Sequence, residues 1–167
     1  MSQTISTANA PVAPYTRITV RPMCAAAGAV IGGVDLSRPL DGETVAEIRR
    51  AFLDHCVIAF RDQDLDPARQ IAFTEHFGKV EGHPLYRTPD IAEFPDVIVL
   101  EHKAGKFYKG KNKLWHSDVT VSETPPLGSV LHCRACWEGF ADTMFANQYL
   151  AYEALSDAMR GFLEGLT

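Results

Sequence analysis

The sequence predicts an α+β fold, and three observations lead to this class. Short apolar runs rich in valine and isoleucine alternate with helix-like segments in the first half of the chain. Strand-like runs then follow one another up to residue 136, and a helical pattern returns near the end. The 167 residues, 46% of them hydrophobic, are enough to bury the core of one ordinary domain. We therefore expect one mixed domain, or part of one.

Composition and charge limit the classes of function. The formal net charge of -5 lacks the basic excess of a general nucleic-acid binder. No stretch approaches the roughly 20 apolar residues that cross a bilayer. Residues 1–16 are polar and small, with two prolines, and do not resemble a signal peptide. We expect a disordered tail over residues 1–16 and a soluble, cytoplasmic protein that binds neither nucleic acid nor membrane.

Three strands are expected in the first half of the chain. Residues 18–23 and 29–36 are rich in β-branched side chains, and the second run contains Gly32 and Gly33, where a bend or bulge is expected. Residues 56–60, "CVIAF", form a continuous apolar run. Such a run is typical of a core strand that is covered on both faces.

Two helices are expected between and after these strands. The first begins at Asp41, a suitable N-cap. Its apolar face recurs at helical spacing, at Val45, Ile48, Phe52 and His55. The second begins at Asp66 and Pro67, and Gly78 is placed to close it.

The second half of the chain is predicted to be mostly strands. The apolar run "VIVLEH" at residues 97–102 opens this part, and strands are expected over residues 114–121 and 127–136. A final helix is expected from about Asn147 to Leu166.

The expected strand over residues 114–121 carries one histidine and one aspartate, two positions apart. Alternate side chains of a strand point to the same side, so His116 and Asp118 would share one face. An imidazole and a carboxylate are two of the three ligands of the facial triad that holds Fe(II) and leaves positions open for a cosubstrate and dioxygen. The ordinary alternative is a histidine satisfied in a core or on a surface. Spacing alone leaves both interpretations open.

Two further features allow more than one interpretation. Cys133 and Cys136 form the C-x-x-C of "CRAC", which is either half of a zinc site or a redox pair. Five lysines lie between residues 103 and 113 without an acidic neighbour. They form either a solvated loop or a lid whose charge attracts anionic ligands.

The segment "WHSDVTVSETPPLGSVL" resembles the taurine dioxygenase branch of the Fe(II)/2-oxoglutarate-dependent dioxygenases, which also includes 2,4-dichlorophenoxyacetate and alkylsulfate dioxygenases. Four more segments are similar to the family in the family's order: "GAVIGGVDLSRPL", "FRDQDLDPARQIAFTEHFG", "HPLY" and "DTMFANQYLAYEALS". The resemblance implies a double-stranded β-helix, or jelly roll, with flanking helices. It also implies Fe(II) as cofactor, 2-oxoglutarate as cosubstrate, and dioxygen. The implied substrate is a small anion, taurine or another alkylsulfonate, which is hydroxylated.

The resemblance assigns the metal and cosubstrate sites by position. His116 and Asp118 match the first two iron ligands of the family, and Trp115 beside them is expected to pack against the site. Thr143 matches the threonine whose hydroxyl contacts the 2-oxoglutarate carboxylate. No catalytic side chain is expected beyond the metal ligands.

The resemblance also assigns a substrate site. His83, Tyr86 and Asn112 match the residues that help to hold the substrate in taurine-specific members. An imidazole, a phenol and a carboxamide all donate hydrogen bonds, which suits the oxygens of a sulfonate or carboxylate. An anionic substrate is therefore expected at these three residues.

Two differences separate the chain from the family pattern. Phe140 and Ala141 replace the usual pair of glycines before "DT", and no residue matches the family's distal iron-binding histidine or its cosubstrate-binding arginine. We therefore expect residues 17–167 to be the N-terminal portion of a C-terminally truncated jelly roll, in a homo-oligomer. The alternative is a catalytically incomplete remnant that acts as a binding or interaction module.

Overall fold

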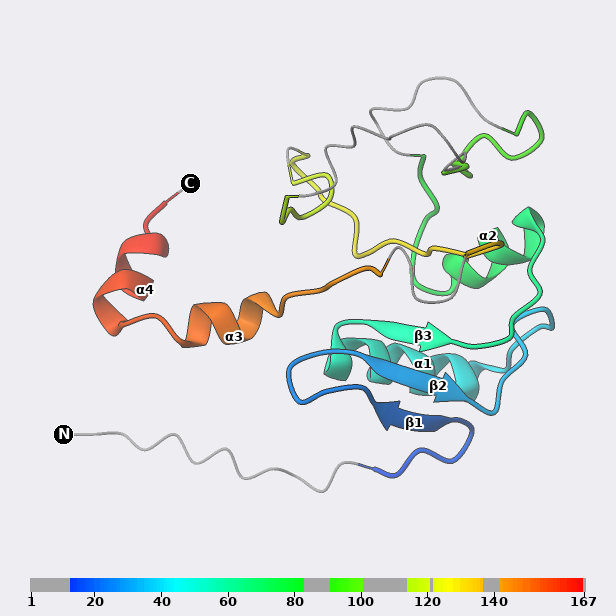
Figure 1. Ribbon diagram of the computed structural model, residues 1–167, viewed down its shortest axis with the longest axis horizontal. Coiled ribbons are helices and arrows are strands. Elements are labelled where there is room, and N and C mark those ends of the chain that lie inside the picture. The colour runs from blue at the N-terminus through cyan, green and yellow to red at the C-terminus, as the bar shows by residue number, and fades with distance from the viewer. Residues whose placement is uncertain (1–12, 83–90, 101–113, 121, 137–141, 167) are drawn as a thin grey trace. The chain divides into compact units, whose positions relative to one another are not determined.

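The computed structural model (Figure 1) describes residues 13–82, 91–100, 114–120, 122–136 and 142–166. The chain divides into two compact units. Unit 1 comprises Met1–Val34, Leu40–Asp62 and Thr143–Thr167, and unit 2 comprises Asp35–Pro39 and Gln63–Asp142.

Unit 1 is built on a three-stranded sheet with the strand order β1-β2-β3. Strand β1 (Thr19–Pro22) runs antiparallel to β2 (Ala29–Gly32). Strand β2 runs parallel to β3 (Ile58–Phe60). All three strands fall inside the predicted runs. Strand β2 ends where Gly33 adopts a φ of 83°, so the bend predicted at the glycine pair is confirmed.

The prediction that the "CVIAF" strand is covered on both faces is wrong. Strand β3 lies at the edge of the three-stranded sheet, and all three of its residues are only half-buried. The buried strand residues are instead Ala29 and Ile31 of β2, the central strand. An apolar run predicts that a strand is buried, but the position of the strand in the sheet decides how far it is buried.

Helix α1 (Gly42–His55) connects β2 to β3 and packs against both strands (Figure 1). The Asp41 side chain caps the helix by accepting a hydrogen bond of 2.8 Å from the Thr44 N–H, as predicted. The predicted packing face is right at Ile48. It is displaced by one residue elsewhere, because Thr44 and Ala51 are the other buried positions.

Glu47 of α1 anchors the chain that leads into β1. Its carboxylate accepts hydrogen bonds from the backbone N–H groups of Thr16 (2.8 Å), Arg17 (2.9 Å) and Ile18 (3.2 Å). Burial raises the pKa of Glu47, but these hydrogen bonds outweigh it and lower the pKa to about 2. The carboxylate therefore stays ionised and satisfies N–H groups that lie outside the β1–β2 ladder.

The ordered contacts with α1 begin two residues before the predicted boundary at residue 17. The Tyr15 hydroxyl donates a hydrogen bond of 3.2 Å to Asp54, and the Arg50 guanidinium lies 4.0 Å from the centre of the Tyr15 ring. Residues 1–12 of the predicted tail lie outside the described residues.

Unit 2 contains helix α2 (Pro67–Glu75). The Asp66 side chain accepts a hydrogen bond of 2.8 Å from the Arg69 N–H, and proline occupies the first turn, as predicted. The helix ends at Glu75, before Gly78. The Gln70 side chain donates a hydrogen bond of 3.1 Å to the carbonyl oxygen of Val130, which ties α2 to segment 128–136.

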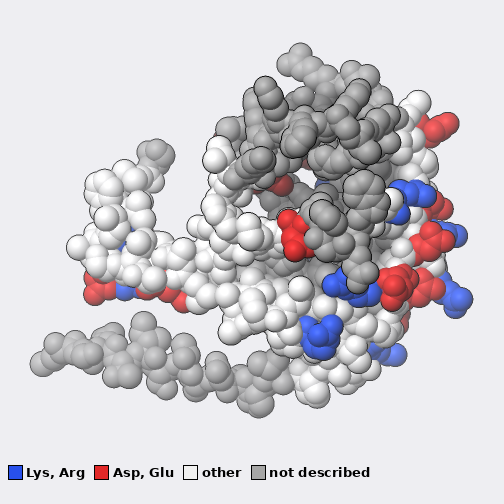
Figure 2. Space-filling model, in the orientation of Figure 1, with Lys and Arg blue, Asp and Glu red and all other residues white. Residues whose placement is uncertain are grey.

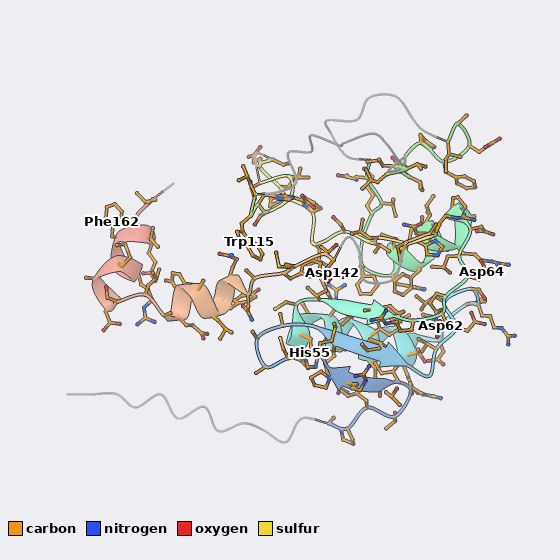
Figure 3. The ribbon with its side chains drawn as sticks, viewed as in Figure 1. His55, Asp62, Asp64, Trp115, Asp142 and Phe162 are labelled. Carbon is orange, nitrogen blue, oxygen red and sulfur yellow. The ribbon has the colours of Figure 1, made fainter. Side chains whose placement is uncertain are left out.

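The helix predicted from residue 147 to residue 166 is two helices, α3 (Gln148–Glu153) and α4 (Asp157–Leu163). The chain breaks at Ser156 because its hydroxyl caps the second helix and accepts a hydrogen bond from the Met159 N–H. The Tyr152 hydroxyl donates a hydrogen bond of 2.7 Å to Glu164 and joins the two helices. Apolar side chains project from them, such as Phe162, which is 63% exposed (Figure 3).

The strands predicted at residues 114–121 and 127–136 are wrong for the residues that the structure describes. Residues 118–120 form a turn, and residues 128–136 run outside any strand. Residues 97–100 also run outside any strand. The jelly roll therefore stays a prediction. Among the described residues, no helix is long and apolar enough to span a membrane.

Replacing Ile48 by alanine is expected to destabilise unit 1. The Ile48 side chain is 1% exposed, so its removal leaves a cavity between α1 and the sheet. The expected loss of unfolding free energy is about 2–5 kcal/mol. Urea denaturation of the variant checks this, with Leu53→Ala as control, because Leu53 of the same helix is 59% exposed. Equal losses in the two variants would contradict the assignment of the packing face.

The pH dependence of stability is expected to change in a Glu47→Gln variant. The pKa of Glu47 is about 2 in the folded chain and 4.5 ordinarily, so its stabilising effect is complete above about pH 4.5 and disappears as the pH falls toward 2. The original chain should therefore lose more stability between pH 5 and pH 2 than the variant, in acid-dependent urea denaturation. Glu153→Gln, on the exposed surface of α3, should keep the original slope.

Candidate metal site

His116 and Asp118 lie together in unit 2, with His116 Nε2 3.3 Å from an oxygen of Asp118. The second ring nitrogen, His116 Nδ1, lies 2.9 Å from the carbonyl oxygen of Leu114. A carbonyl only accepts hydrogen bonds, so this contact places the proton on Nδ1. In the neutral imidazole the lone pair of Nε2 faces the same space as the Asp118 carboxylate, an arrangement that suits a metal ion, whereas the protonated ring forms an ion pair with Asp118.

A strained turn, and not a strand, brings the two side chains together. Residues 118–120 form the turn, and the Ser122 N–H donates a hydrogen bond of 3.0 Å to the Val119 carbonyl oxygen. Val119 has a φ of 54°, which is unfavourable for a β-branched residue and costs about 1–3 kcal/mol. Strain of this kind is concentrated at active sites and ligand clamps, where surrounding contacts maintain it.

The pair is open to solvent. The side chains of His116 and Asp118 are 57% and 54% exposed. One imidazole nitrogen and one carboxylate fit Fe(II), which takes mixed nitrogen and oxygen ligands. Over the ranges that the structure describes, no group of three histidine, cysteine, aspartate or glutamate side chains is placed to hold a metal ion. The described residues therefore bring two candidate ligands together.

Trp115 does not pack against this pair as predicted. Its side chain is 67% exposed, although it comes directly before His116 (Figure 3). A turn, unlike a strand in a barrel, presents no neighbouring strand for the indole to cover.

The charged side chains near α2 neutralise one another. Asp66 lies 3.7 Å from Arg69, and Asp35 lies 3.1 Å from Arg38. Hydrogen bonds from Ser37 lower the pKa of Asp35 further. Figure 2 shows acidic and basic groups side by side on the visible face. These two arginines are paired with carboxylates and remain open to solvent.

The other predicted site residues lie in unit 1 or outside the described residues. Thr143 is exposed and belongs to unit 1, whereas His116 and Asp118 belong to unit 2. The predicted substrate residues, the glycine replacements and the lysine-rich segment all lie outside the described residues: His83, Tyr86, Asn112, Phe140, Ala141 and residues 103–113. Sequence reasoning missed the Leu114 carbonyl and the left-handed Val119. No signal in the side-chain pattern marks a backbone acceptor or a strained φ.

The class of protein follows from comparison with known families. The family described as "Taurine catabolism dioxygenase TauD, TfdA family" matches residues 19–167, which include both halves of the candidate metal pair. The chain therefore belongs to this family of dioxygenases.

Two curated proteins and one crystal structure are similar to this chain. The chain is 34% identical over 154 residues to an "Alkylsulfatase" of Acinetobacter baylyi, covering 92% of this chain and 47% of the relative. It is 32% identical over 164 residues to an "Alpha-ketoglutarate-dependent sulfate ester dioxygenase" of Pseudomonas putida, covering 97% and 52%. A crystal structure of a taurine dioxygenase from Burkholderia xenovorans matches with a TM-score of 0.63 and 32% identity, over 90% of this chain and 52% of that one. The chain spans about half the length of the relatives it matches.

His116→Ala is expected to weaken divalent-metal binding by at least about tenfold, because the imidazole is one of the two candidate ligands. Paramagnetic broadening of amide signals around residues 114–120 by Mn(II) measures this affinity. His132→Ala is the matched control, because His132 lies in the same unit outside the pair. Equal affinity in both variants would rule out His116 as a ligand.

Proposed function

We propose that the chain is part of an Fe(II)- and 2-oxoglutarate-dependent dioxygenase that hydroxylates a small anionic organic substrate. The observation that carries this proposal is the distance of 3.3 Å between His116 Nε2 and Asp118, in a chain of the taurine dioxygenase family. The distance brings together two donors of a kind that suits Fe(II), and the family assignment supports the class of dioxygenase.

His116 and Asp118 would hold the iron, with the Leu114 carbonyl fixing the orientation of the imidazole. When bound, Fe(II) would supply the redox chemistry that activates dioxygen. The Asp118 carboxylate would balance part of the metal charge, and the strained turn at Val119 would hold it beside the imidazole.

Thr143 would bind the cosubstrate through its hydroxyl, which can donate a hydrogen bond to a carboxylate of 2-oxoglutarate. Its exposure leaves the hydroxyl free for a ligand. This role, the jelly roll of residues 17–167, the homo-oligomer and the cytoplasmic location stay predictions.

The substrate is proposed to be taurine, another alkylsulfonate or a sulfate ester. The named relatives include a sulfate ester dioxygenase and a taurine dioxygenase. Sulfonates and sulfate esters share three terminal oxygens on sulfur, which accept hydrogen bonds from the same donors. His83, Tyr86 and Asn112 would supply these donors.

A binding or interaction module is the second candidate. The observation that favours it is the exposure of the metal pair, since two solvated ligands hold Fe(II) weakly. The replacement of two glycines by Phe140 and Ala141 also favours it, because side chains restrict the backbone angles before Thr143.

An anaerobic titration with Fe(II) and then 2-oxoglutarate tests the enzyme. We expect a visible charge-transfer absorption band in the 167-residue chain, because the cosubstrate would chelate the bound iron. The band should be absent in Asp118→Ala and retained in Glu123→Gln, a nearby exposed carboxylate outside the pair. Taurine or an alkyl sulfate should perturb the band, and an uncharged alcohol of the same length should not.

Two results would contradict the proposal. A band that persists in Asp118→Ala would place the iron elsewhere. A folded chain that gives no band would favour the binding module, and binding of taurine without iron, measured by calorimetry, would then support that module.

A further inference from the structure

A pair of thiols lies in unit 2, in segment 128–136, which is neither helix nor strand. Cys133 and Cys136 are both free and both exposed. The segment is held at its start, where the Val130 carbonyl oxygen accepts a hydrogen bond of 3.1 Å from the Gln70 side chain on α2. The two thiols are therefore accessible while the chain that carries them is anchored.

The two thiols also contact each other. A hydrogen bond with Cys133 raises the pKa of Cys136, and the charge of the Cys133 thiolate and burial raise it further. A raised pKa favours the protonated thiol at Cys136, which suits a resolving thiol, and Cys133 is then the thiol that attacks.

We propose that Cys133 and Cys136 form a redox-active dithiol that a hydroperoxide oxidises to an intrachain disulfide. The Cys133 thiolate attacks one peroxide oxygen, the O–O bond breaks, and with hydrogen peroxide the other oxygen leaves as water after protonation. The Cys133 sulfenic acid that results is attacked by the Cys136 sulfur, which forms the S–S bond and releases a second water. Two thiols lose two electrons and two protons, and one peroxide is reduced to two waters.

The geometry favours this role over a structural disulfide or a zinc site. A disulfide between residues three positions apart closes a very short loop and so removes little entropy from the unfolded chain. Exposed disulfides of this kind are labile and readily reduced, as a reversible switch requires. A structural zinc site takes four ligands, and this pair supplies two.

The two remaining cysteines are internal controls in unit 1. The Ala27 N–H donates a hydrogen bond of 3.5 Å to the Cys24 sulfur, and hydrogen bonds from the backbone lower the pKa of Cys24. Cys24 therefore has more thiolate character than an ordinary cysteine, and oxidation should leave it as a sulfenic or sulfinic acid. Cys56 is half-buried at the end of α1. Disulfide formation, and not thiolate character alone, separates the proposed pair from these residues.

The test treats the reduced full chain with stoichiometric hydrogen peroxide and then counts free thiols. The chain has four cysteines, so the Cys24→Ser variant has three, and its count of free thiols should fall from three to one. Trypsin cleaves after Arg134, between the two cysteines, so the disulfide should join the peptides of residues 114–134 and 135–160. A dithiol reductant should separate these peptides and restore both thiols.

Single substitutions complete the test. Cys133→Ser and Cys136→Ser should each abolish the linked peptides, and dimedone should trap a sulfenic acid at Cys133 in Cys136→Ser. Cys56→Ser should leave the linked peptides unchanged. Three results would overturn the proposal: a disulfide that involves Cys24 or Cys56, oxidation of Cys133 and Cys136 to separate sulfinic acids, or links that form only between chains.

Discussion

Unit 1 depends on the way in which its central strand, β2, pairs with one antiparallel and one parallel neighbour. Strand β2 is antiparallel to β1 and parallel to β3. A parallel pair needs a long crossover connection, and α1 supplies it. The same helix covers the sheet through Ile48 and Ala51, and its Glu47 holds the backbone that enters β1. One helix therefore connects the two parallel strands, packs on the sheet and anchors the chain that enters its first strand.

The candidate metal pair depends on a different kind of constraint. His116 and Asp118 are two residues apart, and the contacts that orient them come from Leu114 and Ser122, within a few residues of the pair. The pair is therefore assembled by local backbone geometry. Contacts within a few residues allow the two side chains to meet outside any strand, and both side chains are exposed. In this respect the pair resembles the two thiols of segment 128–136, which also meet at short sequence separation.

The sequence was informative where structure is decided locally. The starts of α1, α2 and α3 could be predicted because Asp41, Asp66 and Asn147 cap them through hydrogen bonds to N–H groups two or three residues away. The runs at residues 114–121 and 127–136 were assigned wrongly because a strand also needs a partner, and an apolar pattern does not identify one. At the site, the spacing indicated that His116 and Asp118 meet. It could not indicate the turn, because a left-handed valine is contrary to that residue's own preference.

The candidate metal pair and the substrate class rest on different observations. The donor pair consists of two residues whose proximity is visible in this chain. The substrate class depends on His83, Tyr86 and Asn112, whose positions in the sequence match the family's substrate-binding residues. The relatives are 32–34% identical and are named for both sulfate esters and taurine. These substrates share an anionic group of oxygens on sulfur. The three proposed donors would therefore recognise that anion. The carbon chain that is hydroxylated must be selected by other contacts.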